Sequence, residues 1–257
     1  GRSTKGRRSA GSHTGALAGI SEVATTAFRR AGIVTVENSD ELFPVAEALS
    51  SLPPMRGRRV AILADGGGHA TIAADVLTDQ GMEIPELAKA TREKLRAVLP
   101  ATATVCNPID VAGGTDADPS VFATCARILL EDPHIDGLLL VGLFGGYGIR
   151  FAERLKFLEE DAAHQMGKLV AGTRKPMIVH SLYRFAKPHS LELLRYYGIP
   201  VYDSLDIACK CVTELAWYGH YTETHHRRTS FVLDWGAGAL PRGRKLIAGA
   251  LAAGRHA

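Results

Sequence analysis

Apolar and polar residues follow a helical spacing near the start of the chain. Between residues 20 and 31 the apolar positions are 20, 23, 24, 27, 28 and 31, which predicts one apolar helical face, and Gly32 then ends the helix. Residues 33–36 predict a short strand, and Asn38 with Ser39 can cap a second helix whose body spans 41–49. One strand and two amphipathic helices cannot bury their own apolar faces, so we expect the other half of this α/β unit to come from elsewhere.

A second unit begins at Arg58 and follows the order strand, glycine turn, helix. Its first strand is predicted at 60–64, its turn at 66–68 and its first helix at 70–77. Further elements alternate along the chain, with strands at 137–143, 177–181 and 199–202 and helices at 119–130, 150–166, 187–197 and 205 to about 217. A polar link with His220, His225 and His226 follows, and the tail to Ala257 contains one weakly helical stretch. This alternation predicts a parallel sheet covered by helices on both faces.

Composition limits the possible classes of protein. The 257 residues are 46% hydrophobic and 22% charged, as in soluble globular proteins, and no apolar run approaches the roughly 20 residues of a membrane helix. We therefore expect a cytoplasmic protein without membrane association. A net charge of +3 is too small to favour nucleic acid as a partner, and the four cysteines lack the spacing of a disulfide framework or a metal site. Because the chain begins at Gly1 inside a polar loop, we expect it to belong to something longer.

The first chemically informative residue is His13. It stands between Gly11 and Gly15 in a segment whose apolar content is Ala10 alone, so no local apolar side chain can bury the ring. A neutral imidazole is a good nucleophile and can carry a phosphoryl group covalently. The alternative is an ordinary polar loop.

Three glycine turns form the second informative feature. The turn Asp65-Gly-Gly-Gly-His69 leads from a strand into a helix, so Gly66, Gly67, Gly68 and His69 direct backbone N–H groups toward one point and predict a phosphate or other anion site. Tight packing is the alternative explanation for the glycines. Two more turns lie at 107–114 and 144–148, and we expect all three to share one edge of the sheet, where open parallel sheets bind ligands.

Four segments in a fixed order, Ser12–Gly19, Asp65–Gly68, Asn107–Val111 and Phe144–Gly146, resemble the NDP-forming (ADP-forming) acyl-CoA synthetases, relatives of succinyl-CoA synthetase. The resemblance covers about residues 1–220. It implies an acid–thiol ligase that interconverts acyl-CoA, ADP and phosphate with an acid, CoA and ATP through an acyl phosphate and a phosphohistidine. It also implies an α/β fold with a flavodoxin-like (Rossmann-type) parallel sheet, preceded by an incomplete second flavodoxin-like unit.

The same resemblance implies a domain organisation. Residues 1–54 are similar to the C-terminal part of a CoA-ligase flavodoxin-like domain that carries the His loop, residues 55–220 to a second such domain, and residues 221–257 to a linker toward an ATP-grasp domain. The implied partners are CoA-binding and ATP-grasp domains or subunits, a small carboxylic acid and further copies in an oligomer. CoA, ATP or ADP and Mg²⁺ are implied for the full-length enzyme, with none bound tightly here. We therefore expect these residues alone to lack synthetase activity.

Residue roles follow from the matched motifs. His13 matches the phosphohistidine, and the helix that should begin at Gly66 to Ala70 matches a helix whose N-terminus holds the phosphoryl group. Substrate contacts are implied for Asp65, Gly145, Gly146 and Tyr147. Asp65 stands where the succinate-specific relatives have Asn, and Tyr147 is bulkier than a succinate site suggests, so we expect a different acid.

Two other classes of function are left open. Related domains occur in protein acetyltransferases, where they sense acyl-CoA without catalysis and the histidine is dispensable; retention of His13 favours the enzyme. A nicotinamide or flavin oxidoreductase would share the sheet type. That class fits less well, because Thr71 stands where the third small residue of a dinucleotide fingerprint belongs.

Overall fold

The computed structural model describes residue 5 and residues 21–225 and 239–253. Contacts divide the chain into two compact units, Gly1–Glu223 and Thr224–Ala257. The second unit contains α11 (Ala239–Ala252), which confirms the helical stretch predicted in the tail. In the described part of the chain, no helix is both long and apolar enough to cross a membrane.

Five parallel strands form one sheet within the described residues, in the order β2-β1-β3-β4-β5. Their bounds are β1 Val60–Ala64, β2 Ile109–Asp110, β3 Gly137–Gly142, β4 Met177–Ser181 and β5 Val201–Tyr202. All residues of β1, β3 and β4 are buried, as expected for strands with helices on both sides. The predicted α/β class with a flavodoxin-like parallel sheet is confirmed, although β2 was not predicted.

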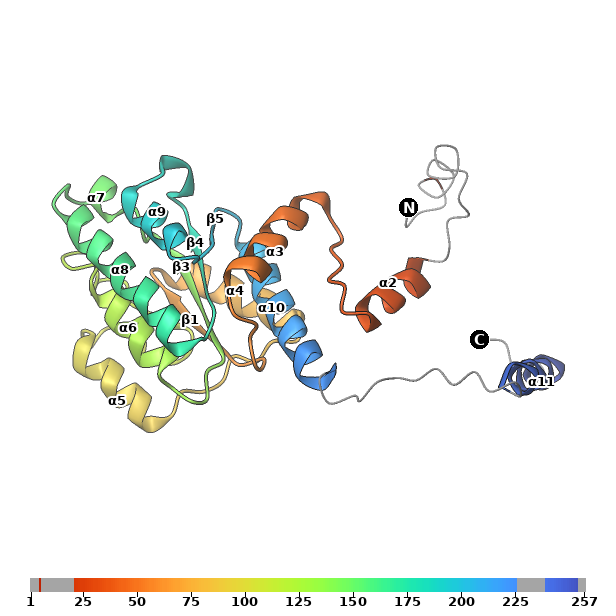
Figure 1. The fold of residues 1–257 in the computed structure, drawn as a ribbon. Coiled ribbons are helices and arrows are strands. Elements are labelled where there is room, and N and C mark those ends of the chain that lie inside the picture. Colours follow the sequence, from red (N-terminus) through yellow and green to blue (C-terminus); the bar gives the residue numbers. More distant parts are fainter. Residues whose placement is uncertain (1–4, 6–20, 226–238, 254–257) are drawn as a thin grey trace. The chain divides into compact units, whose positions relative to one another are not determined.

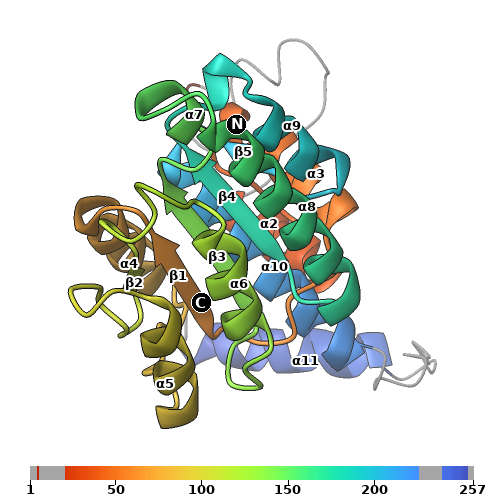
Figure 2. The same cartoon turned by 90° about the vertical axis from the view of Figure 1, so that its left-hand side faces the viewer.

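Helices cover both faces of this sheet. In the first unit they are α2 Ser21–Arg30, α3 Ser39–Ser51, α4 Gly67–Asp79, α5 Lys89–Val98, α6 Val121–Leu130, α7 Tyr147–Arg150, α8 Leu155–Thr173, α9 His189–Tyr196 and α10 Leu205–His225. Helices α3, α4 and α10 lie on one face, and α6 and α8 lie on the other (Figure 1). Figure 2 shows α6 and α8 lying across the sheet on the side that faces the viewer. The apolar core lies between these layers.

The predicted strand at 33–36 is wrong. These residues have no strand pairing in the part of the chain that the structure describes, because a strand exists only where a neighbour accepts its backbone hydrogen bonds. The Arg29 side chain forms hydrogen bonds with this segment instead. Its Nε donates to the Thr35 hydroxyl and a terminal guanidinium nitrogen donates to the Thr35 carbonyl, each over 3.1 Å. The apolar residues of this unit are only partly buried, since Val23 and Phe43 are 63% and 81% exposed whereas Val45 and Ala48 are buried. That the other half of the unit comes from elsewhere stays a prediction.

Helix α10 is longer than predicted and includes residues assigned to a polar link. His220 and His225 lie in the helix rather than in a loop. The Trp217, Tyr218 and Tyr221 rings stack along its surface, and stacking of neighbouring turns stabilises the continued helix. Helix α5 was also missed.

An ion pair joins the amino ends of β1 and β3. Asp136 accepts the Arg59 backbone N–H over 3.0 Å and two guanidinium hydrogen bonds over 2.9 and 2.7 Å. Burial raises the pKa of Asp136, but the hydrogen bonds and charge of Arg59 outweigh it and leave the pKa below its usual value. The pair therefore fixes the strand ends opposite the glycine turns.

Replacing Asp136 by Asn should lower the free energy of unfolding at pH 7 by about 1–2 kcal/mol, a modest value because the Arg59 side chain is 37% exposed. A lowered folded pKa contributes stability that is present above the unfolded pKa of about 4 and is lost as the pH falls through the folded value. The difference in unfolding free energy between wild type and Asp136→Asn, measured by urea unfolding, should therefore shrink as the pH falls toward about 3. Glu153→Gln, at an exposed pair with Lys156, is the control and should change little at either pH. If Asp136→Asn is less stable than wild type by the same amount at every pH, the ion pair does not have the role assigned to it.

Candidate functional site

The three glycine turns gather at the carboxyl edge of the sheet. The turn at 66–68 follows β1, the turn at 107–114 surrounds β2, and the turn at 144–148 follows β3. Because β2, β1 and β3 are parallel neighbours, their carboxyl ends meet, which confirms the expectation of a shared edge. The chain order reverses between β1 and β3, the position at which open α/β sheets bind ligands.

The first turn of α4 presents backbone N–H groups at this edge. Gly66, the N-cap residue, has φ +113°, which glycine adopts without strain, and its N–H donates to Asp110 Oδ1 over 3.0 Å. Gly67 and Gly68 are exposed, and a Cβ at Gly68 would meet no atom within 4 Å. First-turn N–H groups have no acceptor inside the helix, and the helix dipole adds positive potential. The turn can therefore bind an anion.

Two polar side chains hold the turn around β2 against β1. Asn107 Oδ1 accepts the Ile62 N–H over 2.9 Å, and Asn107 Nδ2 donates to the Val60 carbonyl over 2.8 Å, as a neighbouring strand would. Asp110 then fixes Gly66 through the hydrogen bond described above. The motif drew attention to this turn, but only the fold reveals that Asn107 and Asp110 support β1 and α4.

Asp65 and Tyr147 close the crevice between the carboxyl ends of β1 and β3. Both side chains are buried, and the Tyr147 hydroxyl donates to Asp65 and shares a hydrogen bond of 2.5 Å with Thr115. Burial raises the pKa of Asp65, the Tyr147 hydrogen bond opposes this, and the Asp116 and Asp110 carboxylates raise it further. The site thus contains a buried carboxyl group that resists ionisation.

Glu159 organises the β3–α7 loop that contains Gly145, Gly146 and Tyr147. Its buried carboxylate accepts the N–H of Gly145 over 2.6 Å and those of Tyr147 and Gly148 over 3.2 Å each. Burial raises the pKa of Glu159, and the three amide hydrogen bonds offset this only in part. Because these amides already bind a carboxylate of the chain, contact of this loop with a substrate stays a prediction.

Two histidines lie side by side at the same edge. His69 belongs to the first turn of α4, His180 lies near the end of β4, and their ring centroids are 5.7 Å apart. His180 is 2% exposed, and its Nδ1 has no hydrogen-bond partner among the described residues. Burial lowers the pKa of His180, and the charge that His69 can carry lowers it further. No sequence motif marks His180, since a single histidine in an apolar strand resembles any core residue.

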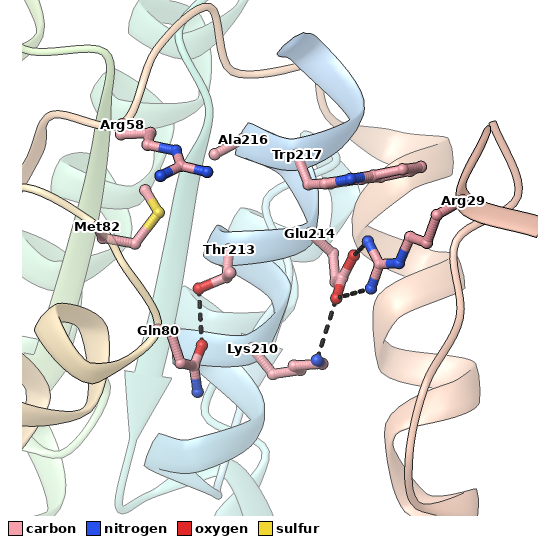
Figure 3. A pocket seen from close by; sticks show the side chains of 9 residues that line it. All are labelled: Arg29, Arg58, Gln80, Met82, Lys210, Thr213, Glu214, Ala216 and Trp217. Atoms are coloured by element: carbon pink, nitrogen blue, oxygen red, sulfur yellow. Dashed lines mark hydrogen bonds and ion pairs between the residues drawn. The ribbon is translucent and has the colours of Figure 1, made fainter. Parts of the chain in front are cut away.

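An ion-pair cluster fastens α2 to α10 (Figure 3). Arg29 donates to both Glu214 carboxylate oxygens over 2.7 and 2.8 Å, and Lys210 donates to one of them over 3.0 Å. The Arg29 guanidinium also lies 4.3 Å from the centre of the Trp217 ring. These side chains line a cavity of about 390 Å³. His13 lies outside the described residues, but the cluster fixes the helix that follows it in the chain.

Comparison with known proteins covers most of the chain. Residues 1–49 match the model of the succinyl-CoA ligase like flavodoxin domain, and residues 60–192 match the model of the Ligase-CoA domain. The alpha subunit of an ADP-forming acetate–CoA ligase II from Pyrococcus furiosus is 30% identical over 79% of this chain and 43% of its own length. An ADP-forming acetate–CoA ligase from Methanocaldococcus jannaschii is 30% identical over 85% of this chain and 30% of its own length.

A solved structure supports the same fold. The dinucleotide forming acetyl-coenzyme A synthetase 1 of Ca. Korarchaeum cryptofilum, in complex with phosphate and ADP, aligns with a TM-score of 0.72 and 22% identity, over 90% of this chain and 48% of that one. The chain therefore spans less than half the length of these relatives.

Replacing Asp65 by Asn should raise the free energy of unfolding at pH 7 by on the order of 1 kcal/mol, because Asn keeps the Tyr147 contact without a buried charge. A raised folded pKa means that the stability contributed by Asp65 is complete below its unfolded pKa and is lost as the pH rises through the folded value. The variant's advantage should therefore vanish in acid. Thermal unfolding over a pH series measures this, with Asp75→Asn at an exposed position of α4 as control. A variant less stable than wild type at pH 7 refutes the account.

Replacing Glu214 by Gln should lower the free energy of unfolding by about 1–3 kcal/mol and expose α2 to protease. The loss of stability stays below that of a fully buried pair, because the Arg29 and Lys210 side chains are 26% and 21% exposed and water can hydrate their charges in the variant. Urea unfolding and the rate of tryptic cleavage at Arg29 and Arg30 provide the two measurements. Glu192→Gln, from a loose pair 4.0 Å from Arg195, should leave both unchanged. Equal cleavage rates for wild type and Glu214→Gln would exclude an anchoring role.

Proposed function

The chain belongs to the family of ADP-forming acyl-CoA synthetases, and from this premise we propose that it is part of an acid–thiol ligase. The proposed reaction interconverts acyl-CoA, ADP and phosphate with a carboxylic acid, CoA and ATP. The relatives named as ADP-forming acetate–CoA ligases support this reaction class. Because the chain spans less than half of those relatives, the proposed partners are CoA-binding and ATP-grasp domains or subunits.

We propose that His13 carries the phosphoryl group. A lone pair of its neutral imidazole attacks the phosphorus of an acyl phosphate, an N–P bond forms, and the bond from phosphorus to the acyl oxygen breaks as the carboxylate leaves. The reverse reaction uses the same bonds. Protein groups contribute chiefly by positioning the reactants and stabilising the charge on the transferred oxygens.

The observation that carries this proposal is the open first turn of α4. Gly67 and Gly68 are exposed, the space beyond Gly68 is free of atoms within 4 Å of a Cβ, and the helix dipole is positive at this end. Such a turn stabilises phosphoryl oxygens without moving during the reaction. We therefore assign the phosphate-binding role to Gly66, Gly67, Gly68 and His69, with Gly66 acting through its turn since its own N–H is held by Asp110.

The acyl group is proposed to lie beside Asp65 and the loop from Gly145 through Gly146 to Tyr147. The Asp110 and Asp116 carboxylates give this part of the site a negative potential. A second carboxylate on the substrate would be repelled there, so these residues favour a monocarboxylic acid over a dicarboxylic one.

The full-length enzyme would use CoA and a nucleotide, which supply the thiol and the phosphoryl acceptor when bound. The described residues of this chain contain no group of three His, Cys, Asp or Glu side chains arranged to hold a metal ion. What the chain itself contributes is an anion-binding helix end and the candidate carrier His13.

The assembled enzyme incubated with ATP labelled in its γ-phosphate should acquire an acid-labile, base-stable label on this chain, because phosphohistidine has that stability pattern. His13→Asn should abolish the label and lower turnover by at least about a thousandfold, since the covalent carrier is lost. His134→Asn, a half-exposed histidine paired with Asp132, is the control and should retain the label. An unlabelled wild-type enzyme would favour the acyl-CoA-sensing regulatory module instead.

A charge placed in the first turn of α4 should compete with the phosphoryl group. Gly68→Glu is expected to weaken the binding of inorganic phosphate to this chain about tenfold, whereas the neutral Gly68→Gln should change it less than about threefold. Both side chains enter open space, and an acidic residue at a helix N-terminus does not destabilise the helix, so thermal stability should be kept. Isothermal titration calorimetry measures the affinities. Equal weakening by Glu and Gln would indicate steric exclusion and would count against the charge-based role.

A further inference from the structure

The proposed mechanism places His69 in the phosphate-binding turn but gives neither its imidazole ring nor that of His180 a chemical task. His180 projects from the end of a central strand with 2% of its surface exposed, and its Nδ1 lacks a partner among the described residues. A buried polar atom without a partner destabilises the folded state, so its presence calls for an explanation. The His69 ring lies beside the His180 ring, and the centroids of the two rings are 5.7 Å apart.

The placement of the pair relates it to the anion-binding turn. His69 is the third residue of α4, so its own N–H belongs to the first-turn amides and its ring lies beside them, with Nδ1 4.0 Å from the Cβ position of Gly66. Besides His69, the groups that act on His180 are the carbonyl and carboxylate of Asp203, which follows β5, and both favour a protonated ring. The two histidines differ in surroundings, because His180 is buried and His69 only half-buried.

We propose that His69 and His180 form a proton-accepting pair that couples the binding of a tetrahedral dianion at the N-terminus of α4 to the uptake of one proton. This inference deepens the proposed function and rests on it, because the dianion it concerns is the phosphoryl group. His69 takes the proton from solvent, donates one N–H to an oxygen of the dianion and donates the other to His180 Nδ1. His180 remains neutral, and its unpartnered nitrogen gains a donor.

The physical reason for the coupling is the mutual stabilisation of the charges. A dianion close to an imidazole favours the imidazolium form, and the imidazolium in turn strengthens the binding of the dianion. The neutral His180 stabilises the same form because only a protonated His69 can donate from both ring nitrogens at once. The ring centroids are 5.7 Å apart, so the half-buried His69 ring has to turn or shift before one of its nitrogens can donate to His180 Nδ1.

Sulfate is the sharpest probe, because it remains a dianion throughout the neutral range and cannot itself take up the proton. Sulfate affinity for this chain, measured by calorimetry, should weaken as the pH rises through the neutral range, by up to about tenfold per pH unit, because one proton is taken up with each anion. Inorganic phosphate, followed in parallel, should bind to the same site. In ¹⁵N-histidine spectra near pH 7.5, sulfate should convert one ring, assigned to His69, from the neutral to the protonated pattern.

Three variants separate the pair from a generic histidine effect. His69→Gln should make sulfate affinity nearly independent of pH, and His180→Phe should weaken it about tenfold at pH 7.5. His180→Phe removes the unpartnered Nδ1 together with the ring's hydrogen bond to the Asp203 backbone, and because these two losses act in opposite directions the melting temperature of the free chain should stay close to that of wild type. His189→Gln, at the start of α9 and 66% exposed in its side chain, is the matched control and should retain the wild-type pH dependence.

Each negative result has a defined meaning. Sulfate binding to wild type that is independent of pH overturns the inference, and so do protonation of a histidine other than His69 and the absence of binding up to about 50 mM. If His180→Phe does not fold, the wild-type spectra decide the question alone. A phosphohistidine without proton-coupled anion binding refutes this inference only, whereas coupled binding without a phosphohistidine refutes the proposed function only.

Discussion

The pairing of β1 with β3 is the constraint on which the rest of the structure depends. Their ladder runs from Val60–Gly137 to Ala64–Val141, and the Asp65 N–H then donates to the Val141 carbonyl over 3.1 Å. The strands can remain this close beyond their ends because Gly142 has no side chain, and a Cβ there would lie 2.7 Å from the Asp65 carbonyl oxygen. This contact brings α4 and the β3–α7 loop to one point, so an anion site and an acyl site can be neighbours.

Acidic side chains surround a site that we propose for an anion, although like charges repel. Most of these acidic groups form hydrogen bonds with other groups of the chain. Asp110 and Glu159 accept backbone N–H groups, while Asp65 is held by Tyr147 in surroundings that raise its pKa. The first-turn amides of α4 remain available to a ligand. These internal hydrogen bonds therefore affect anion binding as much as the formal charges do. A carboxylate that already accepts hydrogen bonds from the chain competes less with a ligand for the amide donors of α4.

Long periodic segments were predictable, while short or partner-dependent ones were not. β1, β3 and β4 were recognisable because a continuous apolar run bounded by turn residues has few other solutions in a soluble protein. β2 has two residues, too few to show any periodicity. It exists because Leu63 and Ala64 of β1 pair with it and because Asn107, just before it, accepts a hydrogen bond from β1. Residues 33–36 show the opposite case, in which an apolar run lacks a strand neighbour among the described residues and therefore forms no strand.

The sequence by itself determined the class of fold, the edge of the sheet at which the glycine turns meet, and the resemblance that identifies the family. These depend on hydrophobic period and on residues such as Gly66, whose backbone angle few other residues can adopt. Only the tertiary structure decided what surrounds the site: Glu159 reaches the β3–α7 loop from α8, and His180 reaches α4 from β4. Neither contact has a local pattern, because residues far apart in the chain meet only after the strands have paired and the helices have packed on them.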